Sequence, residues 1–480
     1  MSTTAGTGFC RVTVVAPDSR IDVALPEDIA LADVYPEILR LSGQSQPDGA
    51  PTGWHLVRRD GTVLDGARSL AGQRVLDGEL LSLRPFAASL PPAVYDDVVD
   101  AVASAVTRDR RRWSDDLMHA AGLVGGVLLL ALMGFVLWFA DPVRHDMHSL
   151  PGIIAGAAGV LLTALSAVRA RVYDDRASAV ALGLAALPLL LIAGSGIIAA
   201  DPGHGQGRLQ FLLGCVTVLV ASALLIAFTP QGDAPFVAAA FVSAVGTLAT
   251  FTEILTEASA TNTAAVCAVA AIAITAFLPA LSARFARLPI GYTAPRGEGS
   301  ETRDEPVDEE KIAARARRGH EMLLGLVGGC SAVVVGCAAV LGFSHSAWAQ
   351  LLALATGTAT LLRARLFRYT AQVACLLVAG IAAICLLVLG LSLNPPVSMI
   401  RDLLTGDSAQ VDIRTMWLAA SVAAGAALLT AIALIVPKKG VSPFWGRLLD
   451  LVEGAVLLSL VPLCLAVLNV YSAARGMTSG

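Results

Sequence analysis

The sequence predicts an α-helical membrane protein that crosses the bilayer many times and carries a small soluble head at its N-terminus. Of its 480 residues, 55% are hydrophobic and only 15% are charged, which is too apolar for an ordinary soluble protein. From residue 119 to residue 471 the chain consists of apolar blocks, each near the length of about 20 residues that a helix needs to cross a hydrocarbon core of about 30 Å. Lipid offers no partner to backbone N–H and C=O groups, so these blocks must be helical.

Residues 1–88 predict the soluble head, because apolar and polar residues alternate there as in strands. The expected elements are two strands, one helix and three further strands, at 9–15, 20–25, 30–41, 54–58, 62–64 and 78–84. This ββαβββ order is that of a ubiquitin-like β-grasp domain. Such small domains usually bind proteins, and a folded cap without a partner is the alternative. His55 is a lone strand histidine, and nothing in the head has catalytic spacing.

Residues 89–118 predict an amphipathic linker helix that leads into an arginine-rich flank. Its apolar stripe recurs every four residues, at Val94, Val98, Val102 and Val106. Directly before the first span come Arg108, Arg110, Arg111, Arg112 and Trp113. Arginines at a membrane entry mark the cytoplasmic side and can contact anionic lipid, although a purely topogenic role fits them equally well.

Residues 119–471 predict a transmembrane domain of eleven helices, of which the eighth is the shortest. The expected spans are 119–140, 149–169, 177–200, 208–229, 234–254, 263–282, 321–343, 346–362, 370–392, 415–436 and 447–470. With the N-terminus inside, the cytoplasmic connectors carry 21 Lys and Arg residues and the opposite connectors carry five. This imbalance predicts a multi-pass protein of the cell inner membrane with a cytoplasmic N-terminus and a periplasmic C-terminus.

The longest cytoplasmic connector, residues 283–320, predicts a docking surface together with the linker helix. Its first part is acidic, and a basic helix with Arg315, Arg317 and Arg318 then enters the seventh span. Both segments combine charge with apolar residues and are long enough to leave the membrane surface. A stripe of valines on a short isolated helix needs cover, either from a partner or from packing within the chain.

The sequence gives no support to an enzyme, a cofactor site or a nucleic-acid-binding protein. Ser-His-Asp, HExxH, P-loop and Rossmann patterns are missing, and the net charge is −4. The eight cysteines show no CxxC spacing, and seven fall in apolar spans, which favours small core residues over disulfides or metal ligands. Charged residues are nearly absent from mid-depth, whereas small residues that allow close helix packing are frequent.

The order of these parts resembles the EccD family, the multi-spanning membrane component of the mycobacterial type VII (ESX) secretion system. The resemblance covers the whole chain and rests on the head, the flank at 108–113 and the loop at 283–320, since the family has no short catalytic signature. It implies a structural component of the inner-membrane export complex beside EccB, EccC and EccE components. It also implies a second copy in each protomer, with the spans enclosing a lipid-filled or vestibule-like space. Energy would come from the EccC ATPase, in agreement with the missing P-loop.

Two other functions remain open from the residues alone. A secondary transporter with a regulatory ubiquitin-like head is compatible with eleven spans, but it would need discontinuous helices and buried ionisable sites, which the sequence does not show. A membrane-tethered ubiquitin-like sensor would need no large complex.

Overall fold

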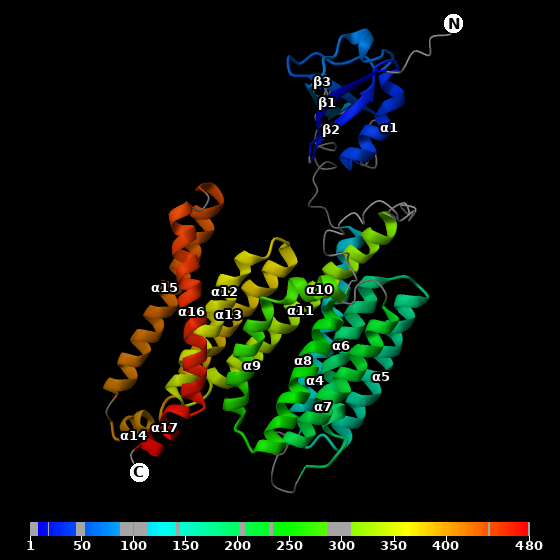
Figure 1. The fold of residues 1–480 in the computed structure, drawn as a ribbon. Helices are drawn as coiled ribbons and strands as arrows, with labels where there is room; N and C mark the ends of the chain where they lie inside the picture. The colour runs from blue at the N-terminus through cyan, green and yellow to red at the C-terminus, as the bar shows by residue number, and fades with distance from the viewer. Residues whose placement is uncertain are drawn as a thin grey trace, which may run out of the picture. The chain divides into compact units, whose positions relative to one another are not determined.

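The computed structural model describes two compact units, Met1–Trp113 and Ser114–Gly480. Within them it describes residues 8–17, 19–44, 53–86, 114–140, 145–200, 207–229, 234–285, 309–406, 408–439 and 442–478, together with Val99. Figure 1 shows the head as a sheet with one helix against it, and the second unit as a bundle of long helices.

The head has the predicted β-grasp fold. Its elements are β1 (Phe9–Val15), β2 (Arg20–Pro26), α1 (Leu31–Ser42), β3 (Trp54–Arg58), the short helix η1 (Ala71–Gln73) and β4 (Glu79–Pro85). The strand order is β2-β1-β4-β3, with β1 and β4 parallel at the centre and the outer pairs antiparallel. Leu31 and Ile38 of α1 are fully buried in one core with Val14, Leu56 and Leu81 of the sheet.

The expected strand at 62–64 is wrong, since only an isolated bridge between Val57 and Val63 forms there. The cause is the tight turn before it. Gly61 has a φ of +88°, and the Asp60 carboxylate accepts the Thr62 backbone N–H at 2.9 Å. The chain returns beside β3 for one residue pair and then turns away.

In the second unit, nine of the described helices are long and apolar enough to cross a membrane. They are α4 (Asp115–Trp138), α5 (Leu150–Arg171), α6 (Arg176–Ser195), α7 (Arg208–Phe228), α8 (Ala234–Thr256), α11 (Glu309–Gly342), α13 (Thr370–Leu393), α15 (Ala409–Lys439) and α16 (Pro443–Val467). Two short helices, α14 (Val397–Leu404) and α17 (Val470–Thr478), complete the C-terminal part.

The sixth and eighth predicted spans differ from this pattern. The sixth is broken into α9 (Ala260–Thr275) and α10 (Leu278–Phe285), which are bent by 67°, and counting the pair as one span gives ten. Pro279 explains the break, because its ring would clash with the carbonyl of Thr275 in a continuous helix. The eighth is α12 (Ala347–Arg363), a helix of 17 residues followed by the turn η2 (Ala364–Leu366). A count of eleven spans stays a prediction.

The helices pack around two main cores. The first core is formed by the five consecutive helices α4 through α8. The second core is formed by α8, α9, α11, α12, α13 and α16. The helix pair α11 and α13 packs especially closely, because glycines face each other. A Cβ at Gly390 would collide with the backbone carbonyl of Gly342. Small residues of this kind let helix backbones approach in a bilayer, where hydrophobicity alone does not drive helices together.

Candidate membrane interfaces

Helix α15 is the long apolar helix that the rest of the described chain covers least. In the most apolar stretch of 18 residues of α15, no residue is buried. In the corresponding stretch of α6, 56% of the residues are buried. It packs mainly on α13 and α14 near its first turns and lies at the edge of the bundle in Figure 1. Large side chains such as Trp417 and Leu428 are exposed along it. In a bilayer this surface must meet lipid, a second copy or another chain.

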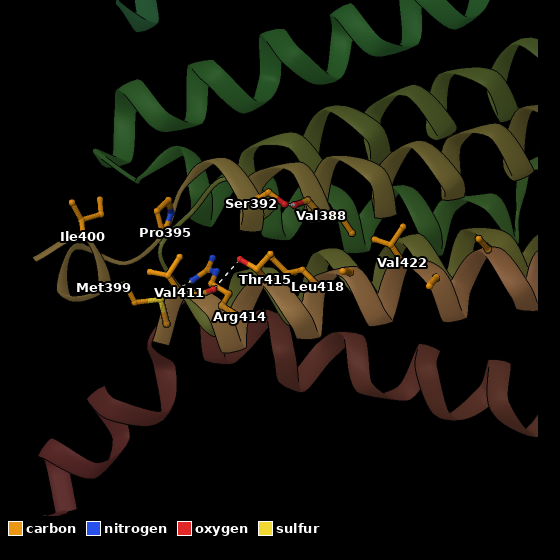
Figure 2. Close-up of a pocket in the computed structure, with 13 residues that line it drawn as sticks. Val388, Ser392, Pro395, Met399, Ile400, Val411, Arg414, Thr415, Leu418 and Val422 are labelled. Atoms are coloured by element: carbon orange, nitrogen blue, oxygen red, sulfur yellow. Dashed lines mark hydrogen bonds between the residues drawn. The ribbon is translucent and has the colours of Figure 1, made fainter. Parts of the chain in front are cut away.

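A groove of about 640 Å³ runs between α13, α14 and α15. Figure 2 shows the side chains that surround it, with Arg414 near the end where α14 lies. The groove is lined by Val388, Ser392, Pro395, Met399, Ile400, Val411, Arg414, Thr415, Leu418, Ala419, Val422, Ala423 and Ala426. Its wall is therefore polar near Arg414 and aliphatic beyond Leu418.

Arg414 ties α15 to the C-terminal end of α13. One terminal nitrogen of its guanidinium donates to the backbone carbonyl of Leu391, and the other lies 3.8 Å from the Met399 sulfur. Carbonyls in the last turn of a helix lack intrahelical donors, so an arginine there stabilises the helix end. No carboxylate of the described residues lies within ion-pair distance of Arg414.

A second groove, of about 580 Å³, lies among α7, α8, α9 and α11, and its arginine is in a different situation. Arg208 donates to the backbone carbonyls of Glu253 and Ala258 at 3.0 and 2.9 Å, and it lies 4.0 Å from the Glu253 carboxylate. The cation at this groove is therefore neutralised by Glu253, whereas no carboxylate in the described part of the chain neutralises Arg414.

Two arginines join α12 to its neighbours at the other end of the bundle. Arg363 is buried and donates to the Thr275 hydroxyl, at the break between α9 and α10. Arg365 lies 2.8 Å from the Asp450 carboxylate and 3.2 Å from that of Glu453, both on α16. Both carboxylates fall near the start of the last expected span, 447–470, but the sequence alone does not identify their partner. The sequence feature that indicates these contacts is the excess of arginine at the end of α12 and directly after it.

The structure places only part of the predicted docking and topology residues. Arg315, Arg317 and Arg318 are exposed on the first turns of α11, which begins at Glu309 and continues unbroken into the bundle. The other predicted residues lie outside the described part of the chain: Val94, Val98, Val102, Val106, Arg108, Arg110, Arg111, Arg112 and Trp113.

In the head, His55 is a packed side chain with only 4% of its surface exposed. Its ring lies 5.1 Å from the Phe86 ring, centre to centre, and its Nδ1 has no hydrogen-bond partner among the residues that the structure describes. Burial, and secondarily the positive charge of Arg84, lowers the pKa of His55 below its ordinary value. The neutral imidazole is therefore the form that the folded head accommodates.

All eight cysteines are free thiols, and five of them are buried. Cys330 on α11 is fully buried against Leu376 of α13, whereas Cys385 on α13 is exposed. Within the described ranges, no cluster of histidine, cysteine or carboxylate side chains has the geometry to hold a metal ion.

Each of the two units matches a known protein family. Residues 118–477 match the family described as EccD-like transmembrane domain, and residues 9–83 match the family described as WXG100 protein secretion system (Wss), protein YukD. The ESX-4 secretion system protein eccD4 of Mycobacterium tuberculosis is 26% identical over 98% of both chains. The ESX-5 secretion system protein EccD5 of Mycobacterium marinum is 27% identical over 91% of this chain and 88% of that protein.

Two solved structures share the fold. Protomer 1 of the ESX-3 core complex matches with a TM-score of 0.61 and 20% identity, over 97% of this chain and all of that one. A MycP5-free ESX-5 inner membrane complex matches with a TM-score of 0.53 and 22% identity, over 88% of this chain and 99% of that one. The first family match covers most of the chain and nearly the whole helical bundle. The chain therefore belongs to the EccD family, the multi-spanning membrane components of type VII (ESX) secretion systems.

Proposed function

We propose that this chain is a structural component of the inner-membrane core complex of a type VII secretion system, where it docks the motor and other membrane subunits. The observation that carries the proposal is α15, a membrane-length apolar helix with none of its apolar window buried by its own chain. A membrane helix that its own chain leaves uncovered offers a lateral surface to other subunits, and a scaffold needs surfaces of this kind. Membership of the EccD family supports the same role.

The proposed partners are EccB-, EccC- and EccE-type components and a second copy of this chain. Support comes from the two structural neighbours, which belong to an ESX-3 core complex and an ESX-5 inner membrane complex. The chain acts without catalysis of its own, and an EccC-type ATPase supplies the energy. The N-terminus lies in the cytoplasm and the C-terminus in the periplasm, which is the orientation that the distribution of Lys and Arg favours.

The main cytoplasmic docking surfaces are the linker helix and the 283–320 loop with Arg315, Arg317 and Arg318. Changing Val98 and Val102 to Asp should leave membrane insertion intact, because both residues precede the first span, and should release partner subunits from the purified complex. In a matched control, Val99 and Ala103 are changed to Asp instead. These two residues have the same spacing but lie off the apolar stripe. If the stripe variant keeps every partner and still supports export, the docking role is wrong.

A secondary transporter is the second candidate, because the break between α9 and α10 is the kind of discontinuous helix that transporters use. Extraction in mild detergent followed by native mass measurement separates the two. A scaffold leaves the membrane with other subunits in a fixed ratio. A transporter leaves alone or with copies of itself, and that result would overturn the proposal.

A further inference from the structure

The groove between α13, α14 and α15 has the depth of one leaflet of a bilayer. Its lining on α15 extends from Val411 to Ala426, which corresponds to about 22 Å at a rise of about 1.5 Å per residue. Half of a bilayer, with its headgroup region, is about 20–22 Å. A helix from a partner or a second copy would contact α15 over the full core of about 30 Å, so the groove fits a lipid chain better than a protein helix.

The polarity of the groove changes along its length in the way a phospholipid requires. Ser392, Arg414 and Thr415 lie at one end, and Val422, Ala423 and Ala426 line the other. Alanines leave room beside the helix for an aliphatic chain. At the polar end, Met399 of α14 borders the groove, and its flexible thioether adapts to ligands of different shape.

Arg414 supplies the charge that a phosphate would neutralise. Two of its five N–H donors are directed to the Leu391 carbonyl and the Met399 sulfur, and no carboxylate of the described chain compensates its charge. A guanidinium forms bidentate, charge-assisted hydrogen bonds with phosphate. Arg208, at the other groove, lies beside Glu253 and is not available in this way.

We propose that this groove is a binding site for one anionic phospholipid, with an acyl chain between α13 and α15 and the headgroup phosphate on Arg414. The bound lipid covers part of the α15 surface that the chain itself leaves open. The site depends neither on the docking residues of the linker nor on the identity of the secretion partners.

The test titrates the purified full-length chain in mild detergent with phosphatidylglycerol, phosphatidylcholine or inorganic phosphate, and counts bound molecules by native mass spectrometry. Phosphatidylglycerol should bind at one site per chain and more tightly than phosphatidylcholine. Arg414→Gln should weaken its binding about tenfold, the effect of losing one hydrogen bond to a charged group. Arg401→Gln, on the exposed face of α14 and outside the groove, should bind as the unchanged protein does.

A second pair of variants keeps Arg414 and tests the acyl-chain position. Ala423→Leu fills the groove and should abolish tight binding, while Ala424→Leu, on the neighbouring face of α15, should not.

Equal binding by Arg414→Gln and unchanged protein, or equal affinity for the two lipids, would overturn the headgroup assignment. Binding of inorganic phosphate as tight as that of the lipid would show a free-phosphate site instead. If Ala423→Leu changes the number of chains in the complex but not the bound lipid, a second copy occupies the groove and the proposal is wrong.

Discussion

Replacing Gly390 with alanine should force α13 away from α11. A Cβ at this position would collide with the Gly342 carbonyl and lie 2.9 Å from the Phe343 backbone nitrogen. Every one of these neighbours is backbone, so no side chain can rotate to make room. One of the two helices must shift by about 1 Å before the contact reaches an ordinary distance of about 3.5 Å.

The structure also supplies the size of the effect and its control. Overpacking by one methyl group in a close-packed interior costs about 1–3 kcal/mol. Gly336, on the facing helix α11, has nothing within 4 Å of a built Cβ, so Gly336→Ala should instead gain about 0.5–1 kcal/mol from helix propensity. The two variants should therefore differ by about 2 kcal/mol or more, which corresponds to roughly 30-fold in the population of opened bundle.

Thiol labelling measures that population. Cys330 is fully buried between α11 and α13, and Cys385 is exposed and serves as the internal reference. In the detergent-purified protein, Cys330 should react at least tenfold faster in Gly390→Ala than in Gly336→Ala, while Cys385 reacts equally in both. Equal reaction of Cys330 in the two variants would refute the packing of α11 on α13 through their glycines.

Three further outcomes are expected. Because the folded head holds His55 with a lowered pKa, its stability should be complete above the ordinary pKa of 6.5 and should fall as the pH drops below it. Urea unfolding of residues 1–88 at pH 7.5 and 5.5 measures this decrease in the free energy of unfolding. His55→Gln should make the difference between the two pH values smaller. The same fragment should give a dispersed amide spectrum, since α1 and the sheet enclose a core of their own, and a collapsed spectrum would contradict an independent head. A reporter that works only in the cytoplasm, fused after Gly480, should stay silent, and a strong signal would reverse the proposed topology.

The head was predictable because its information is local. Alternating side chains fix the faces of β1 and β2, and the apolar face of α1 supplies the cover that the sheet needs. The error at 62–64 has the opposite cause. A run of three residues with strand propensity cannot show where the chain turns away, and the hydrogen bond between Asp60 and Thr62 decides that.

The contacts among the helices were much less predictable. Arg365 and the Asp450 carboxylate are 85 residues apart, and charge alone could not select this pair among several arginines near the same end of α12. Hydropathy also predicted the sixth span as one continuous helix. The reason is that Ala276 and Phe277, at the break, are as apolar as the helices on either side. Only the proline that follows carries the signal.

The position of α15 could not be predicted for a physical reason. In a bilayer, residues that face lipid are as apolar as those that face another helix, so hydropathy reports insertion and not packing. Small residues are frequent at 419–427, as elsewhere in the spans, and favour close packing. Yet α15 has none of its most apolar 18 residues buried, whereas α6 has 56% buried at similar hydropathy. A lipid in the groove accounts for the half of α15 that begins at Arg414. Beyond Ala426, Leu428, Ile432 and Ile435 are exposed at a spacing that places them on one helical face. That half of α15 is an uncovered surface that another chain can contact.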